Sequence, residues 1–387
     1  MKTSQRWLAV HGAAALVVGF GLGPANAATT FNVTNLVSDG FVPAAVTDSS
    51  LINPWGISSG PTSPFWVADN ASGVSTLYST SGAKVPLTVT IPPPGGAVGT
   101  GSPTGTVFNG AASDFHLTAA ANSGAAFLFD SEDGTISGWS PKVSMTSAIL
   151  EVDNSAGGAG AVYKGLAIGS VAGQQFLYAS NFRSGEVERY DSSFSLVNSF
   201  TDPNVASGYS PFNVQVLGGN LFVTYALQDA AKHDDVAGTG NGYVDEFSLS
   251  GAFEKRLVSL GGQVDSPWGL DIAPSSFGSL AGDLLVGNFG DGTISAFDAT
   301  TGAFQGQLLG ADGKPFEEGD LWALSTGNGG AGGDPSKVYF TAGLSDEAHG
   351  LFGSISAVPE PMIWTNLLIG VGLMGAALRR RRLALPA

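Results

Sequence analysis

The chain has 387 residues, of which 43% are hydrophobic, so it can bury a substantial core and is not a disordered protein. Charged residues make up only 12% and there are 56 glycines, which argues against coiled coils and helical bundles and favours short strands joined by tight turns. The absence of cysteine excludes disulfides, thiolate metal sites and cysteine catalysis, and the four histidines leave little room for a zinc enzyme.

The N-terminus has the three parts of a secretory signal peptide. Lys2 and Arg6 precede an apolar run from Trp7 to Leu22, and residues 25–27 read Ala-Asn-Ala. A charged region, an apolar region and a small-residue site predict export through the Sec machinery and cleavage before Ala28. The alternative is an uncleaved membrane anchor.

An apolar stretch from Met362 to Leu378 lies close to the C-terminus. Its 17 residues would reach about 25 Å as a helix, just enough to cross a bilayer core. The stretch is followed by Arg379, Arg380, Arg381 and Arg382. The positive-inside rule keeps such a cluster in the cytoplasm, which places the folded part on the far side of the inner membrane.

Pro359, Glu360 and Pro361 precede this apolar stretch. Pro-Glu-Pro, a single span and an arginine cluster, in this order, resemble the PEP-CTERM sorting signal of Gram-negative bacteria. The resemblance implies recognition by an exosortase, cleavage near Pro-Glu-Pro, and release to or anchoring at the cell surface, in association with exopolysaccharide production. The alternative is an ordinary C-terminal anchor. We therefore predict a signal peptide at 1–27, a folded domain at 28–357 and a sorting signal at 358–387.

Removal of the two ends makes the remaining chain strongly acidic. Six of the 16 basic residues and one of the 32 acidic residues lie in these ends, so residues 28–357 carry a formal charge of about −21. Such a surface repels phosphate backbones, which excludes nucleic acid as a partner. Soluble small molecules, cations and neutral glycans remain as candidate ligands.

Six repeats of roughly 50 residues fill the segment between the ends, as expected of a repeat architecture. Their marker is an aromatic residue followed by a small and an aliphatic residue. Clear copies are Pro54-Trp-Gly-Ile57, Pro211-Phe-Asn-Val214 and Pro267-Trp-Gly-Leu270, and weaker copies are Phe115-His-Leu117, Lys164-Gly-Leu166 and Trp322-Ala-Leu324. Each marker is followed by an apolar strand, and the turns Asp133-Gly134 and Asp291-Gly292 start hairpins.

Three or four strands in each of six repeats predict an all-β, six-bladed β-propeller. The sixth repeat ends after segment 353–357 without a fourth strand, and segment 31–39 has no partner of its own. We therefore expect segment 31–39 to supply the missing strand and close the ring. Two stacked β-sandwiches are the rival architecture, but they do not explain the repeated marker. The Gly-rich segments 95–105 and 327–333 are interpreted as flexible loops.

The whole segment from about Asn32 to Ser356 is similar to a family of PEP-CTERM proteins with an NHL-like six-bladed propeller. The similarity rests on Asn53-Pro-Trp-Gly56, Glu132-Asp-Gly-Thr-Ile-Ser-Gly-Trp139, His233-Asp-Asp-Val-Ala-Gly238 and Asp346-Glu-Ala-His-Gly350. The resemblance implies the fold and the location outside the inner membrane. It implies no activity, because the family has none assigned.

Alternation along the innermost strands predicts which polar side chains face the central channel. They are His116, Asn213, Gln215 and Asp271, among residues that are otherwise mostly Gly, Ala and Ser. One interpretation is a polar plug bridged by water. The other is a metal or ligand site.

The turns between second and third strands are acidic and predict a second candidate site. The fourth turn, from Gln228 to Gly242, is the longest and contains His233, Asp234 and Asp235, while His349 lies in the sixth turn. Carboxylates without thiols suit Ca²⁺ or Mg²⁺ better than zinc. The alternative is that these residues only shape the turns, and the calcium-loop spacing Asp-x-Asp-x-Asp-Gly is absent.

No phosphate-binding loop occurs in the sequence, and no pair of carboxylates stands out as the acid and nucleophile of a glycosidase. The favoured function is therefore an exported, non-enzymatic propeller that binds or scaffolds a component of the cell envelope or exopolysaccharide matrix. The alternative is a divalent-cation-dependent enzyme of lactonase or lyase type, with Asn213 and Asp271 as ligands and His116 as acid or base. A purely structural matrix component is a third interpretation.

Overall fold

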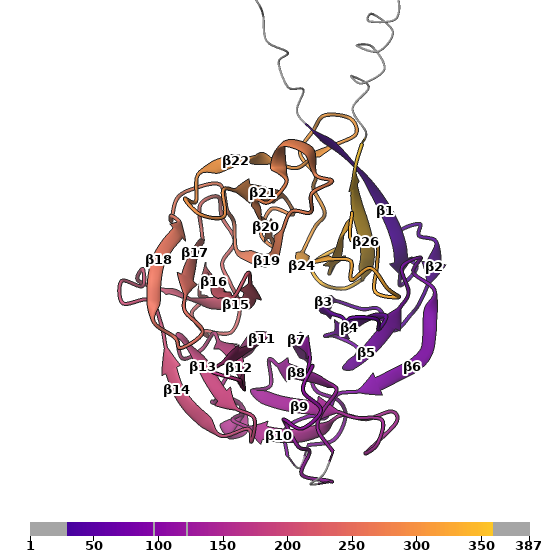
Figure 1. Ribbon diagram of the computed structural model, residues 1–387, viewed down its shortest axis with the longest axis vertical. Helices are drawn as coiled ribbons and strands as arrows, with labels where there is room; N and C mark the ends of the chain where they lie inside the picture. Colours follow the sequence, from indigo (N-terminus) through magenta and orange to yellow (C-terminus); the bar gives the residue numbers. More distant parts are fainter. Residues whose placement is uncertain (1–28, 96, 121–122, 359–387) are drawn as a thin grey trace, which may run out of the picture.

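The computed structural model describes residues 29–95, 97–120 and 123–358, and these form six sheets around a central axis (Figure 1). The six-bladed propeller predicted from the repeats is confirmed. Blades one and two comprise β3 (Pro54–Ser58), β4 (Phe65–Asp69), β5 (Val74–Tyr78) and β6 (Lys84–Thr90), then β7 (Pro103–Phe108), β8 (Phe127–Ser131), β9 (Thr135–Trp139) and β10 (Ile149–Asp153). Every strand pair within these two blades is antiparallel.

The next three blades repeat this four-stranded antiparallel pattern. Blade three is β11 (Tyr163–Val171), β12 (Gln174–Asn181), β13 (Glu186–Asp191) and β14 (Leu196–Phe200). Blade four is β15 (Tyr209–Leu217), β16 (Asn220–Leu227), β17 (Tyr243–Phe247) and β18 (Phe253–Val258). Blade five is β19 (Pro267–Ile272), β20 (Leu284–Asn288), β21 (Ile294–Phe297) and β22 (Phe304–Gln307). Two single turns of 3₁₀ helix, Ala156–Gly158 and Gly278–Leu280, lie in connections.

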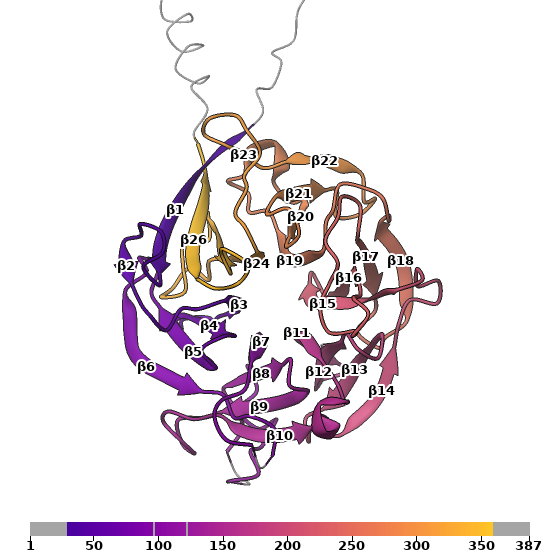
Figure 2. The ribbon, with the colours of Figure 1, turned by 180° about the vertical axis from the view of Figure 1, so that it is seen from behind.

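Blade six is built from both ends of the domain. It contains β24 (Leu321–Thr326), β25 (Val338–Ala342), β26 (Leu351–Ala357) and β1 (Thr30–Ser38), with the short strands β2 (Val46–Thr47) and β23 (Leu309–Gly310) beside β1. Strand β1 runs antiparallel to β26, so the N-terminal segment supplies the fourth strand and closes the ring, as predicted. Both ends of the described chain therefore leave the propeller at the rim of blade six (Figure 2).

The core is divided by blade. Six apolar clusters fill the six gaps between neighbouring blades, and a seventh, which we call the axial aromatic cluster, lies on the central axis. Its largest members are Trp55, Phe182, Phe212, Trp268 and Trp322. The marker aromatics of blades one, four, five and six are thus buried on the axis.

The marker glycines are explained by the crowding of innermost strands around the axis. All six innermost strands have a register shift at the marker, so the strand bends there. A Cβ atom on Gly165 would lie 2.1 Å from the Asn213 side-chain oxygen, and one on Gly269 would lie 2.5 Å from the Trp322 carbonyl oxygen. Only glycine allows neighbouring blades to approach this closely.

The prediction for the second repeat was wrong. The innermost strand of blade two is β7, and the marker assigned to Phe115–Leu117 lies in the β7–β8 connection instead. Phe115 and Leu117 have the aromatic and aliphatic character of a marker because both are buried in the cluster between blades two and three. The start of β7 lies in the Gly-rich segment interpreted as a loop, and its Pro103-Thr-Gly105 shares the Pro-x-Gly spacing of Pro54-Trp-Gly56.

The predicted signal peptide and the sorting signal, including Pro359–Pro361 and the arginine cluster, lie outside the described residues. Within residues 29–95, 97–120 and 123–358 there is no helix of the length and apolar character needed to span a membrane.

Candidate functional site

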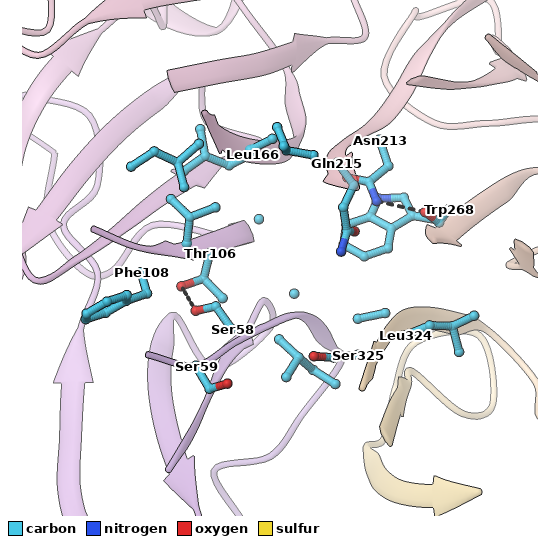
Figure 3. Close-up of a pocket in the computed structure, with 18 of the residues that line it drawn as sticks. Ser58, Ser59, Thr106, Phe108, Leu166, Asn213, Gln215, Trp268, Leu324 and Ser325 are labelled. Atoms are coloured by element: carbon cyan, nitrogen blue, oxygen red, sulfur yellow. Dashed lines mark hydrogen bonds between the residues drawn. The ribbon is translucent and has the colours of Figure 1, made fainter. Parts of the chain in front are cut away.

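A cavity of about 380 Å³, which we call the funnel, lies on the axis between the innermost strands (Figure 3). All six blades contribute to its wall. Its lining comprises Gly56–Ser59, Gly105–Phe108, Leu166–Ile168, Asn213, Gln215, Val216, Trp268 and Ala323–Thr326. Among these described residues none carries a charge.

The axial aromatic cluster closes one end of the funnel. Trp55 and Trp322 stack with ring centroids 3.5 Å apart, and Trp268 meets both rings edge-on. Trp268 and Asn213 are buried, whereas Ser59, Gln215 and Ser325 are partly exposed. The channel is therefore blocked at the aromatic end and opens to solvent where the innermost strands end.

Asn213 and Gln215 both line the funnel, but only Gln215 is free to bind a ligand. The Asn213 amide group donates to the Trp268 carbonyl oxygen (2.7 Å), and its oxygen accepts the Val214 N–H (2.8 Å). Asn213 thus fixes blade four against blade five. The Gln215 side chain makes no hydrogen bond to any other described residue, so its amide can serve a ligand.

Asp271 lies behind the funnel wall rather than in it. Its carboxylate accepts the Thr326 hydroxyl (2.7 Å) and the Ile272 N–H (2.8 Å). Burial raises the pKa of Asp271 to about 6. Since Thr326 lines the funnel, Asp271 determines how that hydroxyl is presented to the cavity.

His116 is not at the channel, contrary to the prediction. It is exposed in the β7–β8 connection and pairs through its backbone with Gly124. The catalytic set of the enzyme alternative is therefore not assembled, because Asn213 and Asp271 are held by intramolecular hydrogen bonds and His116 lies elsewhere.

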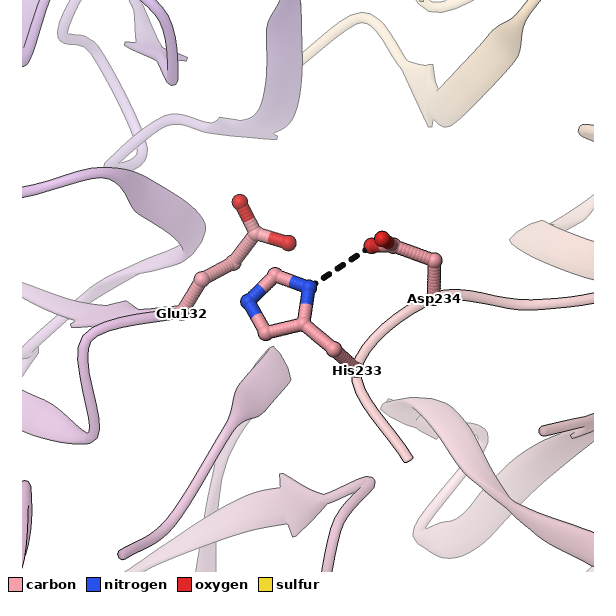
Figure 4. A group of neighbouring side chains, drawn as sticks. All are labelled: Glu132, His233 and Asp234. Carbon is pink, nitrogen blue, oxygen red and sulfur yellow. Dashed lines mark hydrogen bonds and ion pairs between the residues drawn. The ribbon is translucent and has the colours of Figure 1, made fainter. Parts of the chain in front are cut away.

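A second polar group lies where the second-to-third strand turns meet the start of β11. Ligand atoms of Glu132, His233 and Asp234 lie within 4.8 Å of one another, and the His233 Nδ1 is 2.8 Å from Asp234 (Figure 4). The Lys164 ammonium contacts Glu132 and lies 3.3 Å from Asp234. We call these four residues the lysine cluster.

Lys164 carries its charge in a buried setting. Its side chain is 3% exposed and its ammonium lies 5.1 Å from the Trp55 ring centroid. Burial opposes the charged form, yet Glu132 and Asp234 hold the pKa of Lys164 above its ordinary value. Lys164 therefore already neutralises the negative charge that Glu132 and Asp234 would offer a metal ion.

Asparagines connect the lysine cluster to blade six. Asn70 donates to Glu132 (2.9 Å), and Asn53 donates to Glu347 (2.5 Å) while accepting the Trp322 indole N–H (3.0 Å). Burial raises the pKa of Glu347 to about 7. Asn53 also donates to Asn70 (3.4 Å), so the network joins residues of five blades over the axial aromatic cluster.

The four residues predicted as metal ligands do not come together. His233 and Asp234 lie in the lysine cluster, but Asp235 does not belong to that group of ligand atoms, and burial raises the pKa of Asp235. His349 stacks on Phe41 with centroids 3.9 Å apart and pairs with Asp39 (2.7 Å). The sequence did not single out Lys164, although it is a charged residue at a position that is aromatic in four other blades.

Curated relatives of this chain include two proteins from Acanthamoeba polyphaga mimivirus. The uncharacterized protein R648 is 32% identical over 340 residues, covering 86% of this chain and 82% of the relative. The uncharacterized protein L690 is 30% identical over 341 residues, covering 86% of this chain and 87% of the relative. The chain belongs to the family of these two proteins. No family model matches it.

Solved structures are similar in fold. They include a glucose dehydrogenase, with a TM-score of 0.51 and 11% identity over 84% of this chain and all of the other. A protein of unknown function from Bacteroides thetaiotaomicron VPI-5482 has a TM-score of 0.50 and 10% identity. The match covers 85% of this chain and 76% of the other. At such identities the likeness shows the propeller fold alone.

Proposed function

We propose that this protein is an exported binding propeller of the cell envelope or exopolysaccharide matrix, and that its funnel holds a neutral glycan. The observation that carries the proposal is the uncharged, hydrogen-bonding lining of a cavity of about 380 Å³. Pockets of this size with a few placed polar groups suit small organic ligands. Serine, threonine and glutamine side chains both donate and accept, as sugar hydroxyl groups do.

The test is an isothermal titration calorimetry experiment in which neutral oligosaccharides are titrated into the purified protein. We expect saturable binding that Gln215→Ala weakens by roughly tenfold, since a funnel hydrogen bond of about 1.4 kcal/mol is lost. Gln305→Ala, at an exposed position on β22, is the matched control and should leave affinity unchanged. A folded protein that binds no neutral glycan would contradict the proposal.

Export and exosortase processing are proposed from the two ends of the sequence alone. Residues 1–27 have the order of a signal peptide, and Pro359, Glu360 and Pro361 precede an apolar stretch and four arginines. In this proposal the C-terminal segment holds the chain in the inner membrane until an exosortase removes it. Replacement of Pro359–Pro361 with alanines should leave the tail attached, and an unchanged mature mass would contradict sorting.

A further inference from the structure

The funnel has two chemically different sides. Hydroxyl groups come from blades six, one and two, in Ser325, Thr326, Ser58, Ser59 and Thr106, which lie among the apolar Ile57, Val107, Phe108 and Leu324 of the same blades. Blade three contributes only Leu166, Ala167 and Ile168. Figure 3 shows Leu166 across the cavity from Ser58, Ser59 and Ser325. We call these sides the hydroxyl wall and the aliphatic wall.

The hydroxyl wall is only partly satisfied within the protein. Ser58 and Thr106 share one hydrogen bond (3.1 Å), so one of the two hydroxyls keeps a free hydrogen. The Thr326 hydroxyl donates to Asp271 and is left as an acceptor toward the cavity. Ser59 and Ser325 make no side-chain hydrogen bond to another described residue. This wall therefore offers both donors and acceptors to a ligand.

The aliphatic wall offers neither. A ligand hydroxyl placed against Leu166, Ala167 or Ile168 would lose its hydrogen bonds to water without replacement, which is unfavourable. A methyl group in the same place would gain from leaving water. The funnel thus favours a ligand that is polar along one edge and apolar along the other.

We propose that the funnel selects neutral sugars that carry a methyl group, as a 6-deoxy or an acetyl substituent, over the corresponding unsubstituted hexoses. This inference rests on the proposed function, because it requires that the funnel binds glycans. The methyl group lies on the aliphatic wall and the ring hydroxyls on the hydroxyl wall. Uronic acids are excluded, since the Asp271 carboxylate lies behind Thr326 and no lining residue among those described is cationic.

The experiment compares sugars that differ only in whether carbon 6 is a methyl or a hydroxymethyl group. The probes are L-rhamnose against L-mannose and L-fucose against L-galactose, titrated into the full-length protein. Burial of one methyl-sized group predicts about fourfold tighter binding of the methyl-bearing member, from about 0.8 kcal/mol. Ala167→Ser, which adds a hydroxyl to the aliphatic wall, should reduce this ratio toward one, whereas Ser58→Ala should weaken both members and keep the ratio.

The outcomes separate this inference from the proposed function. Equal affinity within every pair overturns the selectivity while leaving glycan binding intact. Binding of no neutral sugar at all to a protein with wild-type thermal stability overturns both. A ratio that survives Ala167→Ser overturns the assignment to the aliphatic wall. Gln305→Ala, outside the funnel, serves as the control for all titrations.

Discussion

The ammonium group of Lys164 contacts the carboxylate of Glu132 in the neighbouring blade, although the Lys164 side chain is only 3% exposed. Removal of the ammonium leaves Glu132, itself 15% exposed, without a counter-charge. We therefore expect Lys164→Met to lower the free energy of unfolding by about 3 kcal/mol, the usual cost of breaking a buried pair. Urea denaturation measures it.

The matched control for this substitution is Lys314→Met. Lys314 pairs with Asp312 at 3.8 Å, but its side chain is 81% exposed. Exposed pairs contribute little, so the change should stay within about 0.5 kcal/mol. Equal losses of unfolding free energy in the two variants would show that the buried Lys164–Glu132 pair stabilises the fold no more than an exposed pair does.

The same contact predicts how the protein responds to divalent cations. Because Lys164 already pairs with Glu132 and Asp234, Ca²⁺ at millimolar concentration should not raise the melting temperature of the wild type. In Lys164→Ala, the ligand atoms of Glu132, His233 and Asp234 become available to the ion. Binding at about 100 times its dissociation constant adds about 2.7 kcal/mol, a rise of roughly a few degrees.

Scanning calorimetry with EDTA and with Ca²⁺ distinguishes these cases. A calcium-dependent rise in the wild type would mean that the ion displaces the ammonium, contrary to the prediction. A variant that fails to respond would mean that the three side chains do not form a cation site even when Lys164 is absent.

The blade repeat could be predicted from sequence because its cause is local. Each innermost strand must bend beside its neighbour, and the Pro-x-Gly spacing at Gly56 and Gly269 records that requirement. Blade two was misassigned because Thr104 replaces the aromatic residue there, while Phe115 is buried for another reason. The alternation rule then placed His116 at the channel and missed Thr106.

The lysine cluster could not be predicted in the same way. Glu132, Lys164 and Asp234 belong to three blades, and their spacing in sequence carries no information about distance. The order in which polar turns converge on the axis is set by packing of whole blades. Only the departure of Lys164 from the aromatic pattern was visible in the sequence.

The close approach of Gly165 to Asn213 gives a further prediction. A Cβ atom at Gly165 would lie 2.1 Å from the Asn213 side-chain oxygen and 3.0 Å from its Cα, so Asn213 would have to move and lose its bond to Trp268. We expect Gly165→Ala to destabilise the protein by about 2 kcal/mol, as overpacking does. Gly319→Ala, where no atom lies within 4 Å, should be neutral or slightly stabilising by about 0.5 kcal/mol in guanidinium denaturation.

Asp271 predicts a specific pH dependence. Burial raises its pKa to about 6 in the folded protein, against about 3.9 in an unfolded chain. Between these values the folded state binds more protons, so the contribution of Asp271 to stability falls as pH rises from about 4 to about 6 and is constant above that. Asp271→Asn should remove this fall.

The measurement is the difference in unfolding free energy between Asp271→Asn and the wild type from pH 4 to pH 8. The difference should move in favour of the variant up to about pH 6 and then level off. Asp312→Asn, at a side chain that is 63% exposed, is the control and should differ from the wild type by less than about 0.5 kcal/mol. A flat difference for Asp271→Asn would show that this carboxyl titrates normally.

Ring closure by β1 predicts that stability depends on the N-terminal strand. Phe31 is 1% exposed and packs on Phe277 between blades five and six, so Phe31→Ala should cost about 3 kcal/mol. Val33, two residues along the same strand, is 39% exposed, and Val33→Ala should cost less than about 0.5 kcal/mol. Thermal unfolding followed by circular dichroism compares the two. Because β1 pairs with β26 from Phe31 to Ser38, interrupted only by one register shift, the Phe31 variant should still unfold in a single transition in which blade six does not melt alone. An early separate transition would show that blade six is closed independently of the other five.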